Sequence, residues 1–209
     1  MRTLGSALVL AATAAVWVAA AGAPVIPAAD ALRTGAPANL IKNGGFEQPV
    51  VAAGGYSLFS KGQSFPGWRV VGAPGNVAPI SGAYTSAGFR FVPKVGRQWI
   101  DLTGLSNSAT GIAQTVGTTA GASYRLSFSV GNVVEPGGIF GTRSTVVVVV
   151  NGRRLLAATN SGGGKSRQSW KTFTTTVKAT SAATTIAFRN GDSHTDNENG
   201  LDAVALSKG

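Results

Sequence analysis

The sequence predicts an all-β protein folded as a two-sheet sandwich, and three observations lead to this prediction. Glycine and proline are frequent, with 29 and 9 residues among 209, and they separate short apolar runs along the chain. Within these runs apolar and polar residues alternate, which is the period of a half-buried strand. After an apolar stretch at the N-terminus, no segment has the period of an amphipathic helix.

Nine segments carry the strand pattern, and turn-forming residues bound them. They are Trp68–Val71, Gln98–Leu102, Gly111–Val116, Ser123–Val130, Arg143–Val150, Arg153–Ala157, Trp170–Val177, Thr184–Phe188 and Leu201–Leu206. The five consecutive valines that end at Val150 suit a central strand buried on both faces. Asn151-Gly152 follows, and this pair accepts the positive φ angles of a tight hairpin. The strands are numerous enough for two packed sheets.

Residues 1–29 are expected to form a signal peptide. One positive charge, Arg2, precedes an apolar stretch from Leu4 to about Ala23, and small residues close it. This profile favours cleavage, at a site between about residues 21 and 29, over the alternative of an uncleaved membrane anchor. No later apolar run is long enough to span a membrane. We therefore expect a secreted protein, extracellular or associated with a cell wall, with a connector over 30–38 and one domain over 39–209.

The composition narrows the class of partner. There is no cysteine, so an exported domain must be stabilised by burial, hydrogen bonds or a metal instead of disulfides. The formal net charge is +10, and it becomes +9 when Arg2 is removed with the leader. The basic residues are scattered and form no arm or stripe that would follow nucleic acid. An anionic polysaccharide is the better partner, unless the charges only keep a Gly-rich domain soluble.

Three separated segments form a more specific pattern when they are read together. They are Asn39–Pro49 (NLIKNGGFEQP), Phe65–Trp68 (FPGW) and Asn199–Val204 (NGLDAV). With them the chain resembles the DUF642-type and choice-of-anchor C group of extracellular proteins, and the resemblance covers nearly the whole mature chain. It implies a galactose-binding-like jelly roll of the carbohydrate-binding-module type.

The resemblance also implies a structural calcium ion. In such a jelly roll the opening turn lies beside the last strand, which brings Glu47 close to Asp202. A calcium ion between these carboxylates, completed by backbone carbonyls, would remove their repulsion and replace the missing disulfides. The metal-free alternative is that Glu47 accepts backbone hydrogen bonds and Asp202 caps a turn. The chain departs from the family's Leu-Asp-Asn-Val ending, because Ala203 stands where Asn is usual.

Trp99 is the candidate platform of a sugar site, because sugars bind where an exposed aromatic face meets polar groups. Strand alternation places Trp99 opposite the core-facing Ile100 and on the same side as Asp101. Other residues expected to complete the site lie in the preceding loop-rich segment: Tyr84, Phe89 and Arg90. The alternative is that Trp99 packs under a loop or against another strand.

The sequence offers little support for an enzyme. His194 is the only histidine, and no Gly-x-Ser-x-Gly nucleophile motif accompanies it. Asp192, Asp196 or Glu198 could pair with Asp101 as the acid and base of a glycosidase, but so polar a loop also fits a solvated surface. The expected function is a secreted, non-catalytic carbohydrate-binding module. An extracellular scaffold that binds another protein is the alternative, because a fold alone does not define function.

Overall fold

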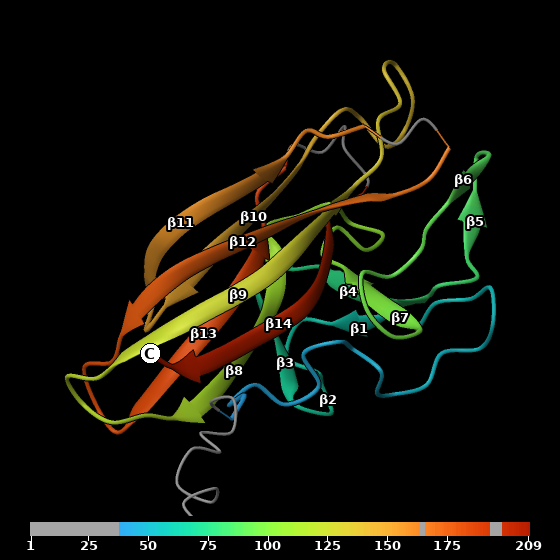
Figure 1. Ribbon diagram of the computed structural model, residues 1–209. Helices are drawn as coiled ribbons and strands as arrows, with labels where there is room; N and C mark the ends of the chain where they lie inside the picture. The colour runs from blue at the N-terminus through green and yellow to red at the C-terminus, as the bar shows by residue number, and fades with distance from the viewer. Residues whose placement is uncertain (1–37, 164–165, 193–197) are drawn as a thin grey trace, which may run out of the picture. The chain divides into compact units, whose positions relative to one another are not determined.

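The computed structural model describes residues 38–163, 166–192 and 198–209, which form an all-β structure (Figure 1). Two six-stranded antiparallel sheets make up its body, and a small hairpin is added to them. The described ranges contain no helix, and therefore none able to cross a membrane. The predicted signal peptide, residues 1–29, lies outside the described residues.

The first sheet has the spatial order β1 (Phe59–Ser60), β4 (Asn76–Ser81), β7 (Gln98–Asp101), β14 (Gly200–Lys208), β9 (Ser123–Asn132) and β12 (Ser169–Lys178). The second sheet has the order β11 (Arg153–Asn160), β10 (Ser144–Val150), β13 (Ala183–Asn190), β8 (Thr110–Gly117), β3 (Trp68–Gly72) and β2 (Ser64–Phe65). The separate hairpin consists of β5 (Thr85–Ser86) and β6 (Phe89–Arg90). From β7 to β14 the chain crosses repeatedly between the two sheets, and only β10 and β11 follow one another within a sheet. The predicted two-sheet jelly roll is therefore confirmed.

All nine predicted strands are present. The Asn151-Gly152 turn joins β10 to β11 with φ angles of 48° and 80°, the left-handed conformation expected of this pair. β10 lies between β11 and β13, as expected for a central strand. Val146 and Val148 are fully buried, whereas Val147 on the opposite face is half-buried. On this outer face Val149 is only 8% exposed, so the predicted burial on both faces holds for part of the strand and fails at Val147.

The alternation pattern does not predict β4. Residues 77–81 of this strand are all buried, because Val77 enters the core between the sheets and Ala78 and Ile80 enter a second apolar cluster on the outer face. A strand covered on both sides loses the apolar–polar period by which strands are identified. Pro79 in its middle argues further against a strand when only the sequence is read.

The main core lies between the two sheets and is built from the inward residues of both. Phe128 of β9 contacts Phe188 of β13 edge to face, with ring centroids 5.2 Å apart. Trp68 of β3 contacts the same Phe188 at 6.2 Å, and its Nε1 donates to the carbonyl of Asn43 at 3.0 Å. The aromatic core thus also fixes the opening segment of the domain.

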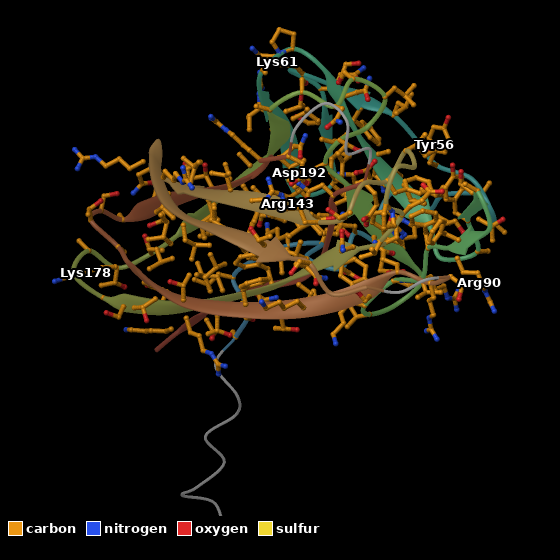
Figure 2. The ribbon with its side chains drawn as sticks, turned by 90° about the horizontal axis from the view of Figure 1, so that it is seen from above. Tyr56, Lys61, Arg90, Arg143, Lys178 and Asp192 are labelled. Carbon is orange, nitrogen blue, oxygen red and sulfur yellow. The ribbon has the colours of Figure 1, made fainter. Side chains whose placement is uncertain are left out.

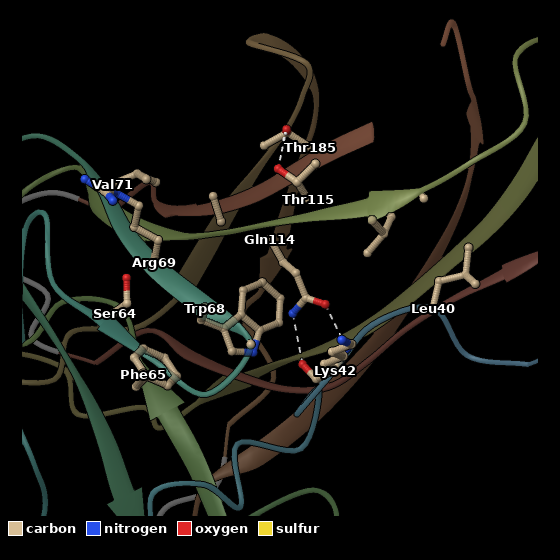
Figure 3. Close-up of a pocket in the computed structure, with 14 residues that line it drawn as sticks. Leu40, Lys42, Ser64, Phe65, Trp68, Arg69, Val71, Gln114, Thr115 and Thr185 are labelled. Atoms are coloured by element: carbon tan, nitrogen blue, oxygen red, sulfur yellow. Dashed lines mark hydrogen bonds between the residues drawn. The ribbon is translucent and has the colours of Figure 1, made fainter. Parts of the chain in front are cut away.

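The opening segment lies against the last strand, so the two ends of the domain meet as expected. Val204 N donates to the carbonyl of Gly44 at 2.9 Å. A side chain at Gly44 would collide with the carbonyl oxygen of Val204, which explains the glycine there. The Gln114 side chain of β8 pairs with both backbone groups of Lys42, at 2.8 and 2.9 Å (Figure 3). The opening segment is therefore tied to both sheets.

Candidate functional site

A second apolar cluster covers the outer face of the first sheet at β4 and β7. Strand alternation turns Trp99 toward this face, while its neighbour Ile100 enters the main core, as predicted. Phe91 stacks on Trp99 with centroids 6.0 Å apart, and Phe140 meets Phe91 edge to face at 5.1 Å. Aromatic side chains from the segments that follow β4 and β9 therefore form a layer over this part of the sheet.

A hollow of about 320 Å³ lies in this layer, and we call it the aromatic pocket. Its aromatic lining consists of Tyr56, Tyr84, Phe91, Trp99 and Phe140. Three aliphatic lining residues are exposed: Leu58, Leu105 and Ile139. Together with Tyr56 they account for four of the seven large hydrophobic side chains that are exposed among the described residues. Exposed apolar side chains gathered around a hollow are typical of a binding surface.

Asp101 contributes a buried carboxyl group to the aromatic pocket from the end of β7. Its Oδ1 accepts hydrogen bonds from the backbone N–H groups of Thr103 and Asn199 at 2.9 and 3.1 Å. Burial raises the pKa of Asp101 to about 6, although the hydrogen bonds from Thr103 and Asn199 oppose this shift. The group is therefore held in a fixed position and retains its proton more readily than an exposed aspartate.

Glu198 contributes a second buried carboxyl group to the same pocket, just before β14. Its Oε2 accepts hydrogen bonds from Val133 N at 3.0 Å and from Ser144 Oγ at 3.1 Å, and its Oε1 accepts one from Gln168 Nε2 at 2.8 Å. Burial, followed by the charge of Asp101, raises the pKa of Glu198 to about 8. The two carboxyl groups together therefore retain a proton at neutral pH.

The aromatic pocket brings together three of the five residues predicted for the sugar site, namely Tyr84, Trp99 and Asp101. Phe89 is buried in the same apolar cluster but does not line the pocket. Arg90 is exposed on β6 and does not line the pocket. Trp99 is only 1% exposed, so the expectation of an exposed platform is wrong. The ring is covered by Phe91 and by Trp170, which meets it edge to face at 6.1 Å. Trp99 packs under a loop, through Phe91, and against another strand, through Trp170 of β12, which is the alternative that the sequence left open.

Among the acidic residues considered as partners for Asp101, the structure places Glu198 beside it. Asp192 instead accepts a hydrogen bond from the backbone of Thr145 at 2.9 Å, and Asp196 lies outside the described residues. Sequence reasoning ranked Tyr56 below Trp99 as a sugar platform and missed Phe140 as a pocket residue. Both lie in irregular segments without alternation, so no local pattern could have assigned them.

Glu47 and Asp202 hold one short segment, residues 94–98, between them. Glu47 Oε1 accepts hydrogen bonds from the backbone N–H groups of Arg97 and Gln98 at 2.8 and 3.1 Å. Asp202 Oδ2 accepts hydrogen bonds from the backbone N–H groups of Lys94 and Val95 at 2.8 and 3.0 Å. The carboxyl groups are close, as expected, and the backbone hydrogen bonds of the metal-free alternative are present.

The Glu47–Asp202 pair also has the chemistry to hold a cation. Burial raises the pKa of Asp202 to about 7, and the charge of Glu47 adds to the shift. No hydrogen bond from a described residue reaches Glu47 Oε2. The described residues contain no group of three or more acidic or histidine side chains that could enclose a metal. A cation at this pair would therefore need backbone carbonyls or water as further oxygen ligands.

A larger hollow of about 680 Å³ lies beside β3 and β8 (Figure 3). Both amide atoms of its Gln114 are already paired with Lys42, and its Trp68 ring is buried. None of the exposed large hydrophobic side chains and none of the unpaired buried polar atoms found in the described residues lines it. We therefore place the candidate site at the aromatic pocket, although it is smaller.

These features define a two-sheet jelly-roll β-sandwich with a pocket on the outer face of one sheet. The chain belongs to the family described as "Protein of unknown function (DUF642)", which it matches over residues 39–207. This confirms the resemblance noted in the sequence. No curated protein matches the chain.

Several solved structures are similar in fold. The sugar-binding C-terminal domain of EclA is 15% identical, with a TM-score of 0.37, and the match covers 46% of this chain and 64% of that one. A family 35 carbohydrate-binding module from Clostridium thermocellum is 14% identical, with a TM-score of 0.41 and coverages of 72% and 97%. A xylan-binding domain of family 22 is 12% identical, with a TM-score of 0.46 and coverages of 68% and 86%. The chain spans slightly less than two thirds of the EclA structure. Sequence identities this low describe a similarity of fold and give no information about function.

Proposed function

We propose that this protein is a non-catalytic carbohydrate-binding module whose sugar site is the aromatic pocket. One observation carries the proposal: exposed apolar side chains, aromatic walls and two carboxyl groups line a single hollow of about 320 Å³. Pyranose rings have apolar C–H faces and hydroxyl edges, so they bind where aromatic rings and hydrogen-bonding groups meet. A polysaccharide is therefore the partner that we propose.

Tyr56 replaces Trp99 as the proposed stacking ring. It is 46% exposed, and Tyr84 supports it edge to face at 6.0 Å. Trp99 is too deeply buried to present a face, but its Nε1 is a buried donor without a partner. In our proposal a ligand oxygen accepts this hydrogen bond, because a buried donor left unpaired is costly.

The two carboxyl groups provide the polar side of the proposed site. Glu198 Oε1 accepts a single hydrogen bond, from Gln168, and so keeps capacity for a sugar hydroxyl. The raised pKa of Glu198 also leaves a proton that the group can donate. Asp101 and Glu198 thus complement the hydroxyl edge of a sugar whose apolar face rests on Tyr56.

We propose no catalytic role for these carboxyl groups. A glycosidase needs one carboxylic acid that protonates the glycosidic oxygen. It also needs a second carboxylate that either acts as the nucleophile or activates a water molecule. Asp101 and Glu198 are only 6% and 1% exposed, and hydrogen bonds hold each from more than one side. This favours a static binding role. Release of reducing sugar by the wild-type protein, lost in Glu198→Gln, would contradict it.

A protein partner is the second candidate, and the exposed rim of the pocket favours it. Leu58, Leu105 and Ile139 together form an apolar border that another protein could cover. Capture of a protein partner that is lost when Leu105 and Ile139 are changed to Ser, with no glycan bound by the wild type, would favour this alternative.

We further propose a structural calcium ion at Glu47 and Asp202. The closeness of two carboxyl groups, one of them with a raised pKa, supports the proposal. Calcium accepts irregular sets of oxygen ligands more readily than magnesium, which requires an octahedral arrangement. When bound, the ion would neutralise the pair and fasten β14 to residues 94–98, so its role would be stability.

We propose that the protein acts outside the cell, in contact with extracellular or cell-wall polysaccharide. The charge and apolar profile of residues 1–29 supports this. Sequencing of the N-terminus after expression in an exporting host tests the proposal. The exported protein should begin between residues 22 and 30, and a protein that keeps Met1 would contradict it.

A matched pair of variants tests the sugar site. Tyr56→Ala removes the proposed stacking ring, and Leu155→Ala removes a side chain of similar exposure, 40%, on β11 outside the aromatic pocket. A glycan array identifies a ligand, and isothermal titration then measures the affinity of each variant for it. We expect Tyr56→Ala to weaken binding roughly ten-fold and Leu155→Ala to leave it unchanged. Equal losses in both variants, or no glycan bound by the wild type, would refute the proposed site.

A further inference from the structure

Three turns gather at one end of the sandwich, which we call the turn end (Figure 1). They are formed by residues 118–122, 151–152 and 179–182. The first turn is joined to the third by a hydrogen bond of 2.8 Å from Gly121 N to the carbonyl of Ala179. Asn151, in the second turn, donates from its Nδ2 to Oγ1 of Thr180 in the third turn at 3.5 Å. The turns therefore form one continuous surface.

Five exposed basic side chains lie at the turn end: Arg125, Arg153, Arg154, Lys178 and Lys208. Strand pairing keeps them near each other across both sheets, because Arg125 lies opposite Ser207 and Lys178 lies opposite Ser123. Within the described part of the chain, none of the five forms an ion pair. Their charges are therefore fully available to a partner.

No described acidic residue lies at the turn end. The six described acids all lie toward the other end of the sandwich: Glu47, Asp101, Glu135, Asp192, Glu198 and Asp202. Asp202 lies opposite Ser129, beyond the middle of β9, Glu135 follows β9, and Asp192 follows β13. β9 has ten residues, so it extends over about 33 Å between the two ends. The other ten described basic side chains share their part of the domain with these acids, whereas the turn end is purely cationic.

We propose that the turn end is a second binding surface, specific for an anionic polysaccharide such as a polymer of uronic acids. Spaced carboxylates along one chain match basic groups that are spread over a surface. A hollow of about 410 Å³ opens at this end, but only one of the five basic residues, Lys208, lines it. Tyr56 of the aromatic pocket and Lys178 lie at opposite ends of the molecule (Figure 2). The two surfaces can therefore be occupied at the same time, and this second surface does not depend on the proposed sugar site.

Nucleic acid and membrane fit the turn end less well. Binding of single-stranded nucleic acid uses aromatic rings that stack on bases, and the only exposed large aromatic side chain in the described ranges, Tyr56, lies at the other end. Binding at a membrane surface uses exposed apolar residues. In the described strands that carry the five basic residues, only one large apolar side chain, Leu155, is exposed. A polyanion without bases or acyl chains needs neither feature.

Two double variants with the same change in net charge test the proposal. Arg153→Glu/Lys178→Glu reverses charge at the turn end. Lys61→Glu/Arg143→Glu reverses the same number of charges elsewhere, and Arg143 precedes the strand β10 whose other end leads to Arg153 (Figure 2). Binding of the full domain is measured against alginate, a polymer of uronic acids, and against carboxyl-reduced alginate as the neutral control. Thermal melting checks that each variant is folded.

The wild type should bind alginate, lose this binding as salt is raised, and not bind the carboxyl-reduced polymer. The turn-end variant should bind alginate at least about ten-fold more weakly, while the control variant changes by less than about two-fold. Equal losses in the two variants would show that net charge alone is responsible and would overturn the proposal. Tighter binding to single-stranded DNA or to anionic vesicles than to alginate would also overturn it. Loss of binding in Tyr56→Ala would show that the polymer enters the aromatic pocket instead.

Discussion

Glu47 and Asp202, from the first turn and the last strand of the domain, accept hydrogen bonds from the same short segment, residues 94–98. The two ends of the domain are thus joined through a third piece of backbone held between two acidic side chains. Because the carboxyl groups also repel each other, this connection is strongest when one of them is protonated or when a cation lies between them.

Calcium should therefore raise the thermal stability of the domain. We expect the melting midpoint to increase when calcium replaces a chelator, because an ion at a hundred times its dissociation constant adds about 2.7 kcal/mol to the folded state. Differential scanning calorimetry at a fixed pH measures the shift. Glu47→Gln should abolish it, whereas Glu135→Gln, which alters an acid away from the pair, should preserve it. A midpoint that is the same in calcium and in chelator would rule out the proposed ion.

The buried carboxyl groups should make the domain less stable as pH rises. The pKa values of Asp101, Asp202 and Glu198 are raised to about 6, 7 and 8, whereas carboxyl groups in an unfolded chain titrate near about 4. Between these limits the folded state binds more protons than the unfolded state. The stabilisation is therefore complete below about pH 4 and is lost as pH rises through about 6 to 8. Urea unfolding in the presence of chelator, repeated from pH 5 to pH 8.5, should show this decline.

Glu198 should cause most of the loss of stability above about pH 7, because its pKa is raised to about 8. Glu198→Gln keeps the shape of the side chain but cannot ionise, so its stability should change less between pH 7 and pH 8.5 than that of the wild type. Glu135→Gln is the control and should follow the wild-type curve. A wild-type protein that becomes more stable across this range would show that the carboxyl groups are not buried as described.

Trp99→Ala should destabilise the fold instead of selectively weakening sugar binding. Trp99 is 1% exposed and packs between Phe91 and Trp170, so its truncation should cost about 3–5 kcal/mol through lost burial and the cavity that remains. Tyr56→Ala, at an exposed position, should cost less than about 1 kcal/mol. Denaturant unfolding compares the two. If Trp99→Ala proved the milder change, Trp99 would be the surface platform that its strand position first indicated.

Ala203→Gly should stabilise the domain by about 0.5–1 kcal/mol. Ala203 has a φ of 54°, which is unfavourable for a residue with a Cβ and lies at an irregularity in the pairing of β14 with β9. Asn, which the family resemblance led us to expect at this position, tolerates this conformation better than Ala does. Ala205→Gly, in the same strand and without a positive φ, should instead lose stability. Destabilisation of similar size by both changes would contradict the strain at Ala203.

The strands and the meeting of the chain ends could be predicted because their signals are local or motif-like. Short runs of alternating or β-branched residues between turn signals identified nine strands, and the Asn-Gly pair identified the β10–β11 hairpin. The opening NGGFE turn and the closing NGLDAV segment indicated that Glu47 and Asp202 approach each other. β4 was not predicted, because a strand that is buried on both faces does not show alternating apolar and polar residues.

The sequence by itself determined which face of β7 carries Trp99 and Asp101, because side chains alternate strictly along a strand. It could not determine what covers that face. Only the tertiary structure decided that Phe91, Phe140 and Trp170 bury the Trp99 ring, that Tyr56 is left exposed beside it, and that Glu198 lies next to Asp101. The physical reason is that such neighbours come from loops and strands far apart in the chain, and their positions depend on how the sheets pack instead of on any local period.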